Sequence, residues 1–388
     1  MLGRSSPFWL VSVLVGLLTF GLIPSKRSQL PTRLVRHTRR SQPPATDLTG
    51  SLFGRHSGIA VRQICPRHTS ASRSCHERVF VSGHLGKSWS DASPGHFEAE
   101  QVVADLAFLD PQRWWFVTNN CGPFQSYVYG TADNGAAWWR HLMGGAECHG
   151  GTISTDFVDQ THGWYVYIEP AGPFATIRRT SDGGRTWSRE QDLPTLGDVS
   201  FIDRRLGYLA ETWYAGGRLY RSRSAGRRWA RFRVPRPSRY RHATLAYDTP
   251  TFQGHRGTLP VSLVKKHRED EAFYISRDGG RTWKLGCVVR PHVHVHKGTT
   301  GRAAPLSTDI VNRRVWWLVA KGAPYIYKTR DGGNTWSRFR SKLHGIESIS
   351  AIGRRRAWAS AIGPGGHRER LYRTLDGGRS WHRLHVRS

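Results

Sequence analysis

Acidic residues are scarce in this sequence. Its 388 residues hold 28 Asp and Glu against 58 Lys and Arg, a formal net charge of +30 at pH 7. Lysine is scarce too, since 9 of the basic residues are Lys and 49 are Arg, spread from Arg4 to Arg387. Charge of this size attracts nucleic acid, anionic lipid and acidic polymers. A GC-rich genome favours arginine in the same way, so a selected anionic partner and a compositional bias both stay open.

Several signatures of enzymes and metal sites are absent. There is no G-x-S-x-G elbow, P-loop, dinucleotide fingerprint or H-E-x-x-H, and we expect no cofactor. The five cysteines fit no zinc spacing and contain no C-x-x-C. In an exported protein the pairs closest in sequence, Cys65 with Cys75 and Cys121 with Cys148, are the candidate disulfides, and Cys287 stays unpaired. Five buried thiols are the alternative.

Long apolar runs are scarce as well. The 38% of hydrophobic residues and 11% of aromatic residues can fill a core, which excludes wholesale disorder, collagen and a polytopic membrane protein. Residues 7–24 form one run of 18 without a charge, close to the ~20 that span a bilayer. Residues 1–24 are therefore predicted to be a signal-anchor or a signal peptide, and we expect export. Because no small-x-small cleavage pattern follows, the retained anchor is favoured.

A basic linker follows this run. Residues 25–46 carry Pro, Ser and Arg without a sustained apolar period, which is typical of a spacer between a membrane and a domain. A basic segment beside a membrane can also contact anionic headgroups.

An eight-residue motif recurs through residues 47–388. Four copies are nearly identical: TSDGGRTW (180–187), SRDGGRTW (276–283), TRDGGNTW (329–336) and TLDGGRSW (374–381). Three degraded copies keep the frame: SGHLGKSW (82–89), TADNGAAW (131–138) and SRSAGRRW (222–229). Their closing residues are Trp89, Trp138, Trp187, Trp229, Trp283, Trp336 and Trp381. The sequence therefore contains seven units of similar length.

Each unit predicts two hairpins. D-G-G is a strong turn signal, because Asp bonds the amides of its own turn and Gly accepts positive φ. The closing Trp offers a large apolar body for packing between sheets. Upstream, segments such as FLDPQRWW (108–115) and FVDQTHGW (157–164) combine an apolar strand, a polar turn and an aromatic strand. Two hairpins per unit mean four strands, and seven such units describe a β-propeller.

The motif S/T-x-D-x-G-x-S/T-W resembles the Asp-box, or BNR repeat, of sialidase-like, sortilin-like and photosystem II assembly factor propellers. The resemblance covers residues 47–388 and implies an all-β, seven-bladed β-propeller with Asp-box hairpins. In this chain the propeller is preceded by the one N-terminal hydrophobic segment described above. Six blades are the alternative if a terminal unit is degenerate. One propeller architecture hosts enzymes, receptors and scaffolds, so the function stays open at this point.

The acids offer little for glycoside hydrolysis, which needs two carboxylates about 5–10 Å apart across a cleft. The F/Y-R-I-P signature of sialidases is absent. Nine of the 17 aspartates have a structural explanation in turns, among them the motif residues Asp133, Asp182, Asp278, Asp331 and Asp376. The weak catalytic candidates are Glu211 and Glu169, with Glu147, Asp156 and Asp198 as further leftover acids. Glu211 stands beside Trp213 and Tyr214, which could stack on a sugar, but it can equally offset nearby arginine.

Histidines and paired tryptophans form two other patterns. His292, His294 and His296 alternate with valine, so a strand would turn all three imidazoles to one face, where they are weak metal-binding candidates. A pH-responsive surface or a solvated strand edge are the alternatives.

In the tryptophan pairs 114–115, 138–139 and 316–317, adjacent side chains on a strand should face opposite ways, so one of each pair is expected in the core. The other could stack on a base or sugar.

These observations favour an exported, membrane-tethered, non-catalytic propeller that works as a binding or assembly scaffold. Its partner would be a protein or glycan ligand, with an anionic envelope polymer or lipid as further candidates and the membrane reached through residues 7–24. Nucleic-acid binding is expected in vitro as a consequence of charge rather than as a biological role. A sialidase-like or other glycoside hydrolase and a photosystem II assembly factor-like protein are the alternatives.

Overall fold

The structure is a computed structural model. It describes residues 48–52, 56–64, 76–95, 97, 101–120, 125–145, 152–169, 174–211, 217–265, 268–291, 306–320, 323–362 and 369–386. The chain divides into residues 1–42 and 43–388, and all described residues belong to the second unit. The predicted anchor and most of the linker therefore lie outside the described residues. Within the described ranges, no helix has the length and apolar character needed to cross a membrane.

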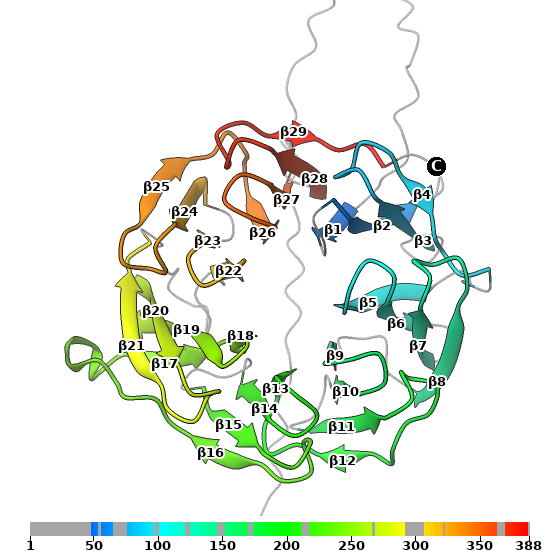
Figure 1. Ribbon diagram of the computed structural model, residues 1–388, viewed down its shortest axis with the longest axis horizontal. Helices are drawn as coiled ribbons and strands as arrows, with labels where there is room; N and C mark the ends of the chain where they lie inside the picture. Colours follow the sequence, from blue (N-terminus) through cyan, green and yellow to red (C-terminus); the bar gives the residue numbers. More distant parts are fainter. Residues whose placement is uncertain are drawn as a thin grey trace, which may run out of the picture. The chain divides into compact units, whose positions relative to one another are not determined.

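Seven antiparallel sheets, called blades 1 to 7 in chain order, surround a central axis (Figure 1). The strands of blades 1 to 3 are β1 (Leu48–Leu52), β2 (Gly58–Ile64), β3 (His76–Ser82), β4 (Ser90–Asp91), β5 (Gln101–Phe108), β6 (Trp114–Asn120), β7 (Gln125–Thr131), β8 (Trp139–Gly145), β9 (Thr152–Phe157), β10 (Gly163–Ile168), β11 (Ala175–Thr180) and β12 (Gln191–Asp192). The strands of blades 4 and 5 are β13 (Gly197–Phe201), β14 (Gly207–Glu211), β15 (Leu219–Ser222), β16 (Ala230–Phe232), β17 (Thr244–Tyr247), β18 (Thr251–Gln253), β19 (Arg256–Lys265), β20 (Arg268–Ser276) and β21 (Lys284–Val289). The strands of blades 6 and 7 are β22 (Leu306–Ile310), β23 (Trp316–Ala320), β24 (Tyr325–Thr329), β25 (Ser337–Arg340), β26 (Ile346–Ala351), β27 (Ala357–Ile362), β28 (Glu369–Thr374) and β29 (His382–Arg383).

This arrangement confirms the predicted seven-bladed propeller with two hairpins per blade, and the six-bladed alternative is wrong. Six blades have four strands in sequence order, and blade 5 adds β18 against β19. A short 3-10 turn, η2 (Ser238–Tyr240), precedes blade 5. The first strand of a blade lies nearest the axis, as β1, β9 and β22 show in Figure 1, and in blade 5 β18 is drawn closest to it.

The Asp-box turn is closed by its own side chains, as the copy in blade 6 shows. The Thr329 hydroxyl accepts from the Gly333 amide at 2.9 Å and donates to Asp331 Oδ1 at 2.7 Å. Asp331 in turn accepts from the Thr335 amide at 2.9 Å and from the Thr335 hydroxyl. The two central glycines have φ of 73° and 94°, a region that L-residues with a Cβ adopt only under strain. These bonds lower the pKa of Asp331 to about 2, led by those from Thr335.

Each Asp-box turn is also bonded to the turn that precedes the second strand of the same blade. In blades 3, 6 and 7, for example, the Gly183, Gly332 and Gly377 amides donate to carbonyls of Thr161, Arg314 and Arg355 at 2.8–3.0 Å. Equivalent bonds occur in the other four blades. Both sets of turns therefore share one side of the ring, which we call the turn face.

The tryptophan pairs do not divide into one core residue and one exposed residue as expected. Trp114, Trp115, Trp316 and Trp317 are all at most 1% exposed. Both faces of a second strand are covered, because a blade packs on the preceding blade with one face and on the following blade with the other. Trp115, for instance, stacks on Phe157 of blade 3 at a centroid distance of 3.8 Å.

The closing tryptophans of the motif are less buried than the second-strand aromatics. Trp283 is 4% exposed, whereas the other six are half-buried. Trp187 meets Phe157 edge-on at 6.2 Å and donates its indole N–H to the Gly184 carbonyl at 3.1 Å. The Asp-box Trp therefore covers the edge of the interface between blades, and the second-strand aromatics fill its centre.

The ring closes without exchanging a strand between the first and last blades. Blades 1 and 7 are each complete in themselves, so the seam between them is held by packing and a few hydrogen bonds. Trp358 is fully buried in a cluster with Phe80, Leu371 and Leu384. Across the seam, Arg62 Nη1 donates to the Val386 carbonyl at 3.0 Å.

A basic side chain joins several pairs of consecutive blades. It stands immediately before the first Ser or Thr of the motif and donates to a backbone carbonyl in the next blade's motif turn. Arg179 reaches Ala225 at 2.8 Å, Arg221 reaches Gly280 at 3.1 Å, Lys328 reaches Gly377 at 2.7 Å, and Arg373 reaches Leu85 at 2.9 Å. Part of the basic excess therefore has a structural role.

Candidate functional site

The strongest catalytic candidate is held by structural hydrogen bonds. Glu211 ends β14 and is 4% exposed. Its carboxylate accepts from the Thr195 hydroxyl at 2.6 Å and from the Arg218 amide at 2.7 Å, with Arg218 Nε at 3.8 Å. Trp213 and Tyr214, the expected stacking partners, lie outside the described residues. Glu211 is therefore held by Thr195 and by the Arg218 amide just before β15.

Asp156 belongs to a set of carboxylates on first strands that bond the next blade. Asp105 accepts from the Thr155 amide and hydroxyl at 2.6 and 2.7 Å, and Asp156 accepts from the Phe201 amide. Asp309 accepts from the Ala351 amide in the same way. Desolvation raises the pKa of Asp105 and Asp309 to about 6 and that of Asp156 to about 7. Asp198, whose charge contributes to the raised pKa of Asp105, lies on β13.

Three consecutive acids that the sequence argument missed are buried in blade 5. Glu269, Asp270 and Glu271 on β20 are 4%, 9% and 2% exposed. Desolvation raises the pKa of Glu271 well above its ordinary value, and the Ser262 hydroxyl donates to this carboxyl at 2.9 Å. Tyr240 donates to Asp270 at 2.7 Å. Their burial keeps them from a substrate in solution.

The remaining predicted residues are placed as follows. Glu169 is half-buried just after β10. The Cys287 thiol is free and half-buried, and desolvation raises its pKa to about 11. Among the described residues no group of His, Cys, Asp or Glu could hold a metal ion. Several candidates lie outside the described residues: Glu147, His292, His294, His296, Cys65, Cys75, Cys121 and Cys148.

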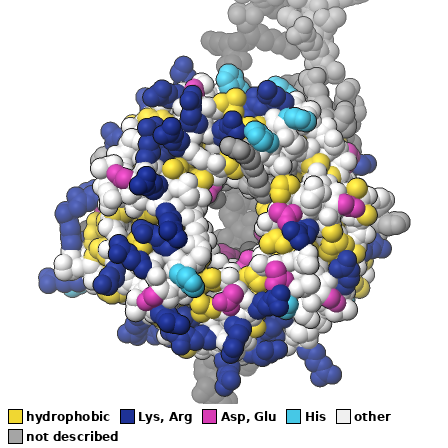
Figure 2. Space-filling model, in the orientation of Figure 1, with side chains coloured by type: hydrophobic (Ala, Val, Ile, Leu, Met, Phe, Trp, Pro, Cys, Tyr) yellow, Lys and Arg dark blue, Asp and Glu magenta, His cyan; other side chains and the backbone are white. Residues whose placement is uncertain are grey.

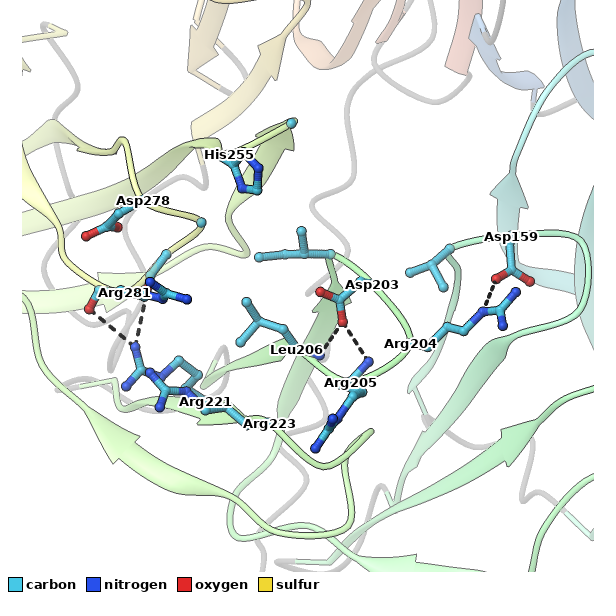
Figure 3. A pocket seen from close by; sticks show the side chains of 15 residues that line it. Asp159, Asp203, Arg204, Arg205, Leu206, Arg221, Arg223, His255, Asp278 and Arg281 are labelled. Carbon is cyan, nitrogen blue, oxygen red and sulfur yellow. Dashed lines mark hydrogen bonds and ion pairs between the residues drawn. The ribbon is translucent and has the colours of Figure 1, made fainter.

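An open depression of about 940 Å³ lies on the turn face where blades 3, 4 and 5 meet. Its lining comes from the turn between β13 and β14, the end of β15, the turn before β19 and the Asp-box of blade 5. Its charged residues are Asp159, Asp203, Arg204, Arg205, Arg221, Arg223, His255, Asp278 and Arg281. We call it the arginine depression (Figure 3).

Every acidic side chain that lines the arginine depression already accepts hydrogen bonds from the protein. Asp159 accepts from the Arg204 guanidinium at 2.8 Å, and hydrogen bonds from Thr161, Arg204 and His162 lower its pKa despite desolvation. Asp203 accepts from two amides of its own turn at 2.7 and 2.8 Å. Asp278 closes the Asp-box of blade 5.

Three of the arginines in this depression have no partner for their side chains among the described residues. Arg221 donates to the Gly280 carbonyl and lies over the Phe232 ring, and Arg204 is paired with Asp159. Arg205, Arg223 and Arg281 are exposed and all line the depression; Figure 3 shows Arg281 on one side of it and Arg223 and Arg205 along another. Exposed guanidinium groups that are not neutralised can bind carboxylates or phosphates through two parallel N–H bonds.

The sequence holds a partial signal for this site. Basic pairs stand in first turns, such as Arg204–Arg205 and Arg313–Arg314, and basic residues recur inside the motif. Because arginine is distributed over the whole chain, these positions are not distinctive until the fold brings them to one face. Figure 2 shows Lys and Arg around the entire ring, with fewer Asp and Glu between them.

Comparisons with known proteins agree with this fold. A BNR/Asp-box repeat family model matches residues 274–285, which contain the motif copy of blade 5. A comparison with curated proteins gives no sequence match.

Solved structures with a similar fold include proteins of different functions. A structure of YCF48 bound to a D1 peptide has 15% sequence identity and a TM-score of 0.51, covering 89% of this chain and 96% of that chain. A prolyl endopeptidase has 10% identity and a TM-score of 0.56, covering 89% of this chain and 50% of that one. A Hadza microbial sialidase, Hz136, has 12% identity and a TM-score of 0.41, covering 75% and 71%. At these identities the likeness concerns the fold alone.

Proposed function

We propose that this protein is an exported, membrane-tethered propeller without catalytic activity that works as a binding or assembly scaffold, and that the arginine depression holds an acidic segment of its partner. The observation that carries this proposal is the set of Arg205, Arg223 and Arg281, which face one hollow while every nearby acid is engaged. An acidic peptide would supply the missing carboxylates.

Two further observations support binding rather than catalysis. The best carboxylate candidate, Glu211, is buried and bonded to its own blade, and Asp156 joins two blades. Neither lines the arginine depression. A propeller of similar fold, YCF48, has been solved with a D1 peptide, which supports a peptide as the class of ligand.

A peptide-binding assay tests the proposal. Fluorescein-labelled peptides rich in Asp and Glu would be titrated with the full chain, and binding followed by anisotropy at 0.15 M and 0.5 M salt. Because surface charges more than about 8 Å apart are screened at 0.15 M, unspecific attraction to a +30 protein should collapse with salt. We expect saturable binding of at least one peptide that persists at 0.5 M.

Matched variants separate the depression from overall charge. The triple variant R205A/R223A/R281A should weaken binding at least tenfold. The triple variant R313A/R314A/R340A removes the same charge from exposed positions on blade 6, outside the depression, and should bind as the wild type does. Equal losses in both variants would show that the depression is not the site.

Export and tethering need a separate test. Residues 7–24 support this part of the proposal through their length and lack of charge. A reporter enzyme that is active only outside the cytoplasm, fused after residue 388, should be active and should fractionate with membranes. Loss of this activity on deletion of residues 1–24 would support export through this segment. An inactive full-length fusion would contradict export, and an active fusion that is recovered in the soluble fraction would contradict tethering.

A further inference from the structure

A second depression lies on the turn face at the seam between blades 7 and 1. It has a volume of about 660 Å³ and is lined by His56, Gly83, His84, Leu85, Lys87, Arg355, Arg356, Arg373 and Leu375. It occupies the same place in the repeat as the arginine depression, between the first turn of one blade and the motif turn of the next. We call it the seam depression.

The lining of the seam depression contains four Lys and Arg side chains, two histidines and no acid. The arginine depression, by contrast, contains Asp159, Asp203 and Asp278. Lys87, Arg355 and Arg356 are exposed and have no side-chain partner among the described residues. The two equivalent sites therefore differ in local charge balance, because the arginine depression has acids in its lining and the seam depression has none.

Two departures from the repeat remove the acids. In the motif of blade 1, His84 stands where five other copies have Asp and blade 4 has Ser224, and its Nδ1 lies 3.0 Å from Ser88 Oγ in place of the Asp–Thr bond. In the first turn of blade 7, Gly353 stands where blade 4 has Asp203 and blade 6 has Asn312. His84 lines the seam depression itself, and Gly353 stands two residues before Arg355, which also lines it.

A third departure places an apolar surface there. Leu375 follows the first Thr of the blade 7 motif, where the other close copies have Ser181, Arg277 or Arg330. It is 41% exposed, although a large apolar side chain at a turn gains nothing from contact with water. With Leu85, which is 8% exposed, it gives the depression an apolar part beside the cationic one.

Arg373 links this lining to the closure of the ring. It lies on β28 of blade 7 and donates through Nη1 to the Leu85 carbonyl of blade 1 at 2.9 Å. Its Nε is buried and has no hydrogen-bond partner among the described residues. Histidine and basic side chains gather over this part of the ring in Figure 2, between the last and first blades.

We propose that the seam depression binds a phosphate monoester with an apolar body, and that this ligand fastens blade 7 to blade 1. The phosphate accepts from Lys87, Arg355 and Arg356, and the apolar body covers Leu375. A dianionic headgroup matches a cluster of several cations better than a single carboxylate does. Other neighbouring blades are joined by the chain itself, so only here does a ligand bridge two ends that the backbone leaves separate.

The test measures binding and seam stability on the full chain at constant ionic strength. Calorimetric titrations would use inorganic phosphate, phenyl phosphate, benzoate and dihexanoyl phosphatidate below its micellar concentration. We expect phenyl phosphate to bind at least tenfold more tightly than inorganic phosphate and benzoate. Tighter binding of the phosphatidate would identify a lipid as the source of the same headgroup, and equal binding would indicate a soluble ester.

Ligand binding should also stabilise the ring. At a hundredfold excess over Kd, phenyl phosphate should raise Tm by about 4 °C. Hydrogen exchange should slow at the amides of residues 82–88 and 353–357 more than in blades 3 and 4. A rise in Tm without this local protection would contradict fastening at the seam.

Variants at the seam distinguish a specific binding site from nonspecific electrostatic attraction of the anion to a basic protein. R355A/R356A should abolish binding of phenyl phosphate, whereas R313A/R314A, with the same charge change in blade 6, should leave it intact. H84D restores the motif acid, so it should fold as well as the wild type and still lose the ligand. L375S should reduce the preference for phenyl over inorganic phosphate. Wild-type affinity in H84D would overturn the proposal.

This site is independent of the proposed peptide site. The variant R205A/R223A/R281A should retain phenyl phosphate binding, and R355A/R356A should retain peptide binding. Failure of one proposal therefore leaves the other to be decided by its own variants.

Discussion

Replacing Asp105, Asp156 and Asp309 by asparagine tests how the first strands are joined across blades. Each carboxylate accepts a backbone N–H from the next blade, and desolvation raises the three pKa values to about 6, 7 and 6. An acid with a raised pKa binds protons more tightly in the folded than in the unfolded protein. Its contribution to stability is therefore greatest at low pH and is lost as pH rises from about 4 to about 7.

The size of the effect follows from the same values. A tenfold change in proton affinity corresponds to about 1.4 kcal/mol. A pKa rise from 3.8 to about 6 therefore sets an upper bound of about 3 kcal/mol for Asp105 and Asp309, and a rise to about 7 sets one of about 4 kcal/mol for Asp156. All three residues are half-buried, and the water that they retain reduces this penalty. We expect about 1 kcal/mol for each and about 3 kcal/mol together between pH 5 and pH 8.

The Asp-box acids act in the opposite direction. Hydrogen bonds from Thr335 and Thr329 lower the pKa of Asp331 to about 2, so the stability that this residue contributes is present above pH 4 and is lost toward pH 2. The two groups together place the highest stability between about pH 4 and pH 5.

Thermal and denaturant unfolding from pH 4 to pH 8 measure this profile. Wild-type Tm should fall between pH 5 and pH 8, and the triple variant D105N/D156N/D309N should flatten the slope and be more stable at pH 8. Protonation of the 19 histidines acts on both proteins alike, so the difference isolates the carboxylates. A slope that is unchanged in the triple variant, or a wild-type Tm that rises with pH, would refute the reasoning.

Three further predictions concern other parts of the ring. Trp115→Ala should cost about 3–5 kcal/mol of unfolding free energy, because the ring is 1% exposed and stacked on Phe157. Trp187 is half-buried, so Trp187→Ala should cost about 1–2 kcal/mol. Denaturant unfolding compares the two variants, and equal losses would contradict the difference in burial. Asp331→Ala should lower the free energy of unfolding, since it removes the acceptor of the amide and hydroxyl of Thr335, and Asp331→Asn should recover part of this loss in the same assay. Cys287 should react slowly with iodoacetamide at pH 8, because desolvation raises its pKa to about 11; peptide mass mapping against free cysteine measures the rate, and fast labelling would contradict its burial.

Local chemistry explains why the blade pattern was predictable. The Thr335 amide donates to Asp331 and the Gly333 amide donates to the Thr329 hydroxyl. Both bonds span four residues, so they depend on the motif itself rather than on what surrounds it. Seven motif copies with similar spacing then require seven repeated hairpins. The prediction of a BNR/Asp-box propeller followed from these short-range patterns.

The catalytic candidates were harder to judge, because a carboxylate's role depends on what faces it. Glu211 and Asp156 looked unassigned in the sequence, yet the structure pairs them with Thr195 and with the Phe201 amide. Asp156 and Phe201 are 45 residues apart, in neighbouring blades. No local sequence pattern predicts a contact between residues so far apart in the chain.

The sequence by itself determined the repeat, the turn chemistry, the all-β class and the excess of arginine, because each rests on residue types or on contacts within one hairpin. Tertiary structure decided which residues face one another across blades. It buried both members of the pair Trp316 and Trp317, since a blade in a ring has a neighbour on each side. It also brought Arg205, Arg223 and Arg281 from three turns into one depression, and His84 to Arg355 from opposite ends of the propeller. These residues become neighbours only when the blades pack into a closed ring. Ring closure depends on contacts between all the blades, so it cannot be predicted from any single segment of the sequence.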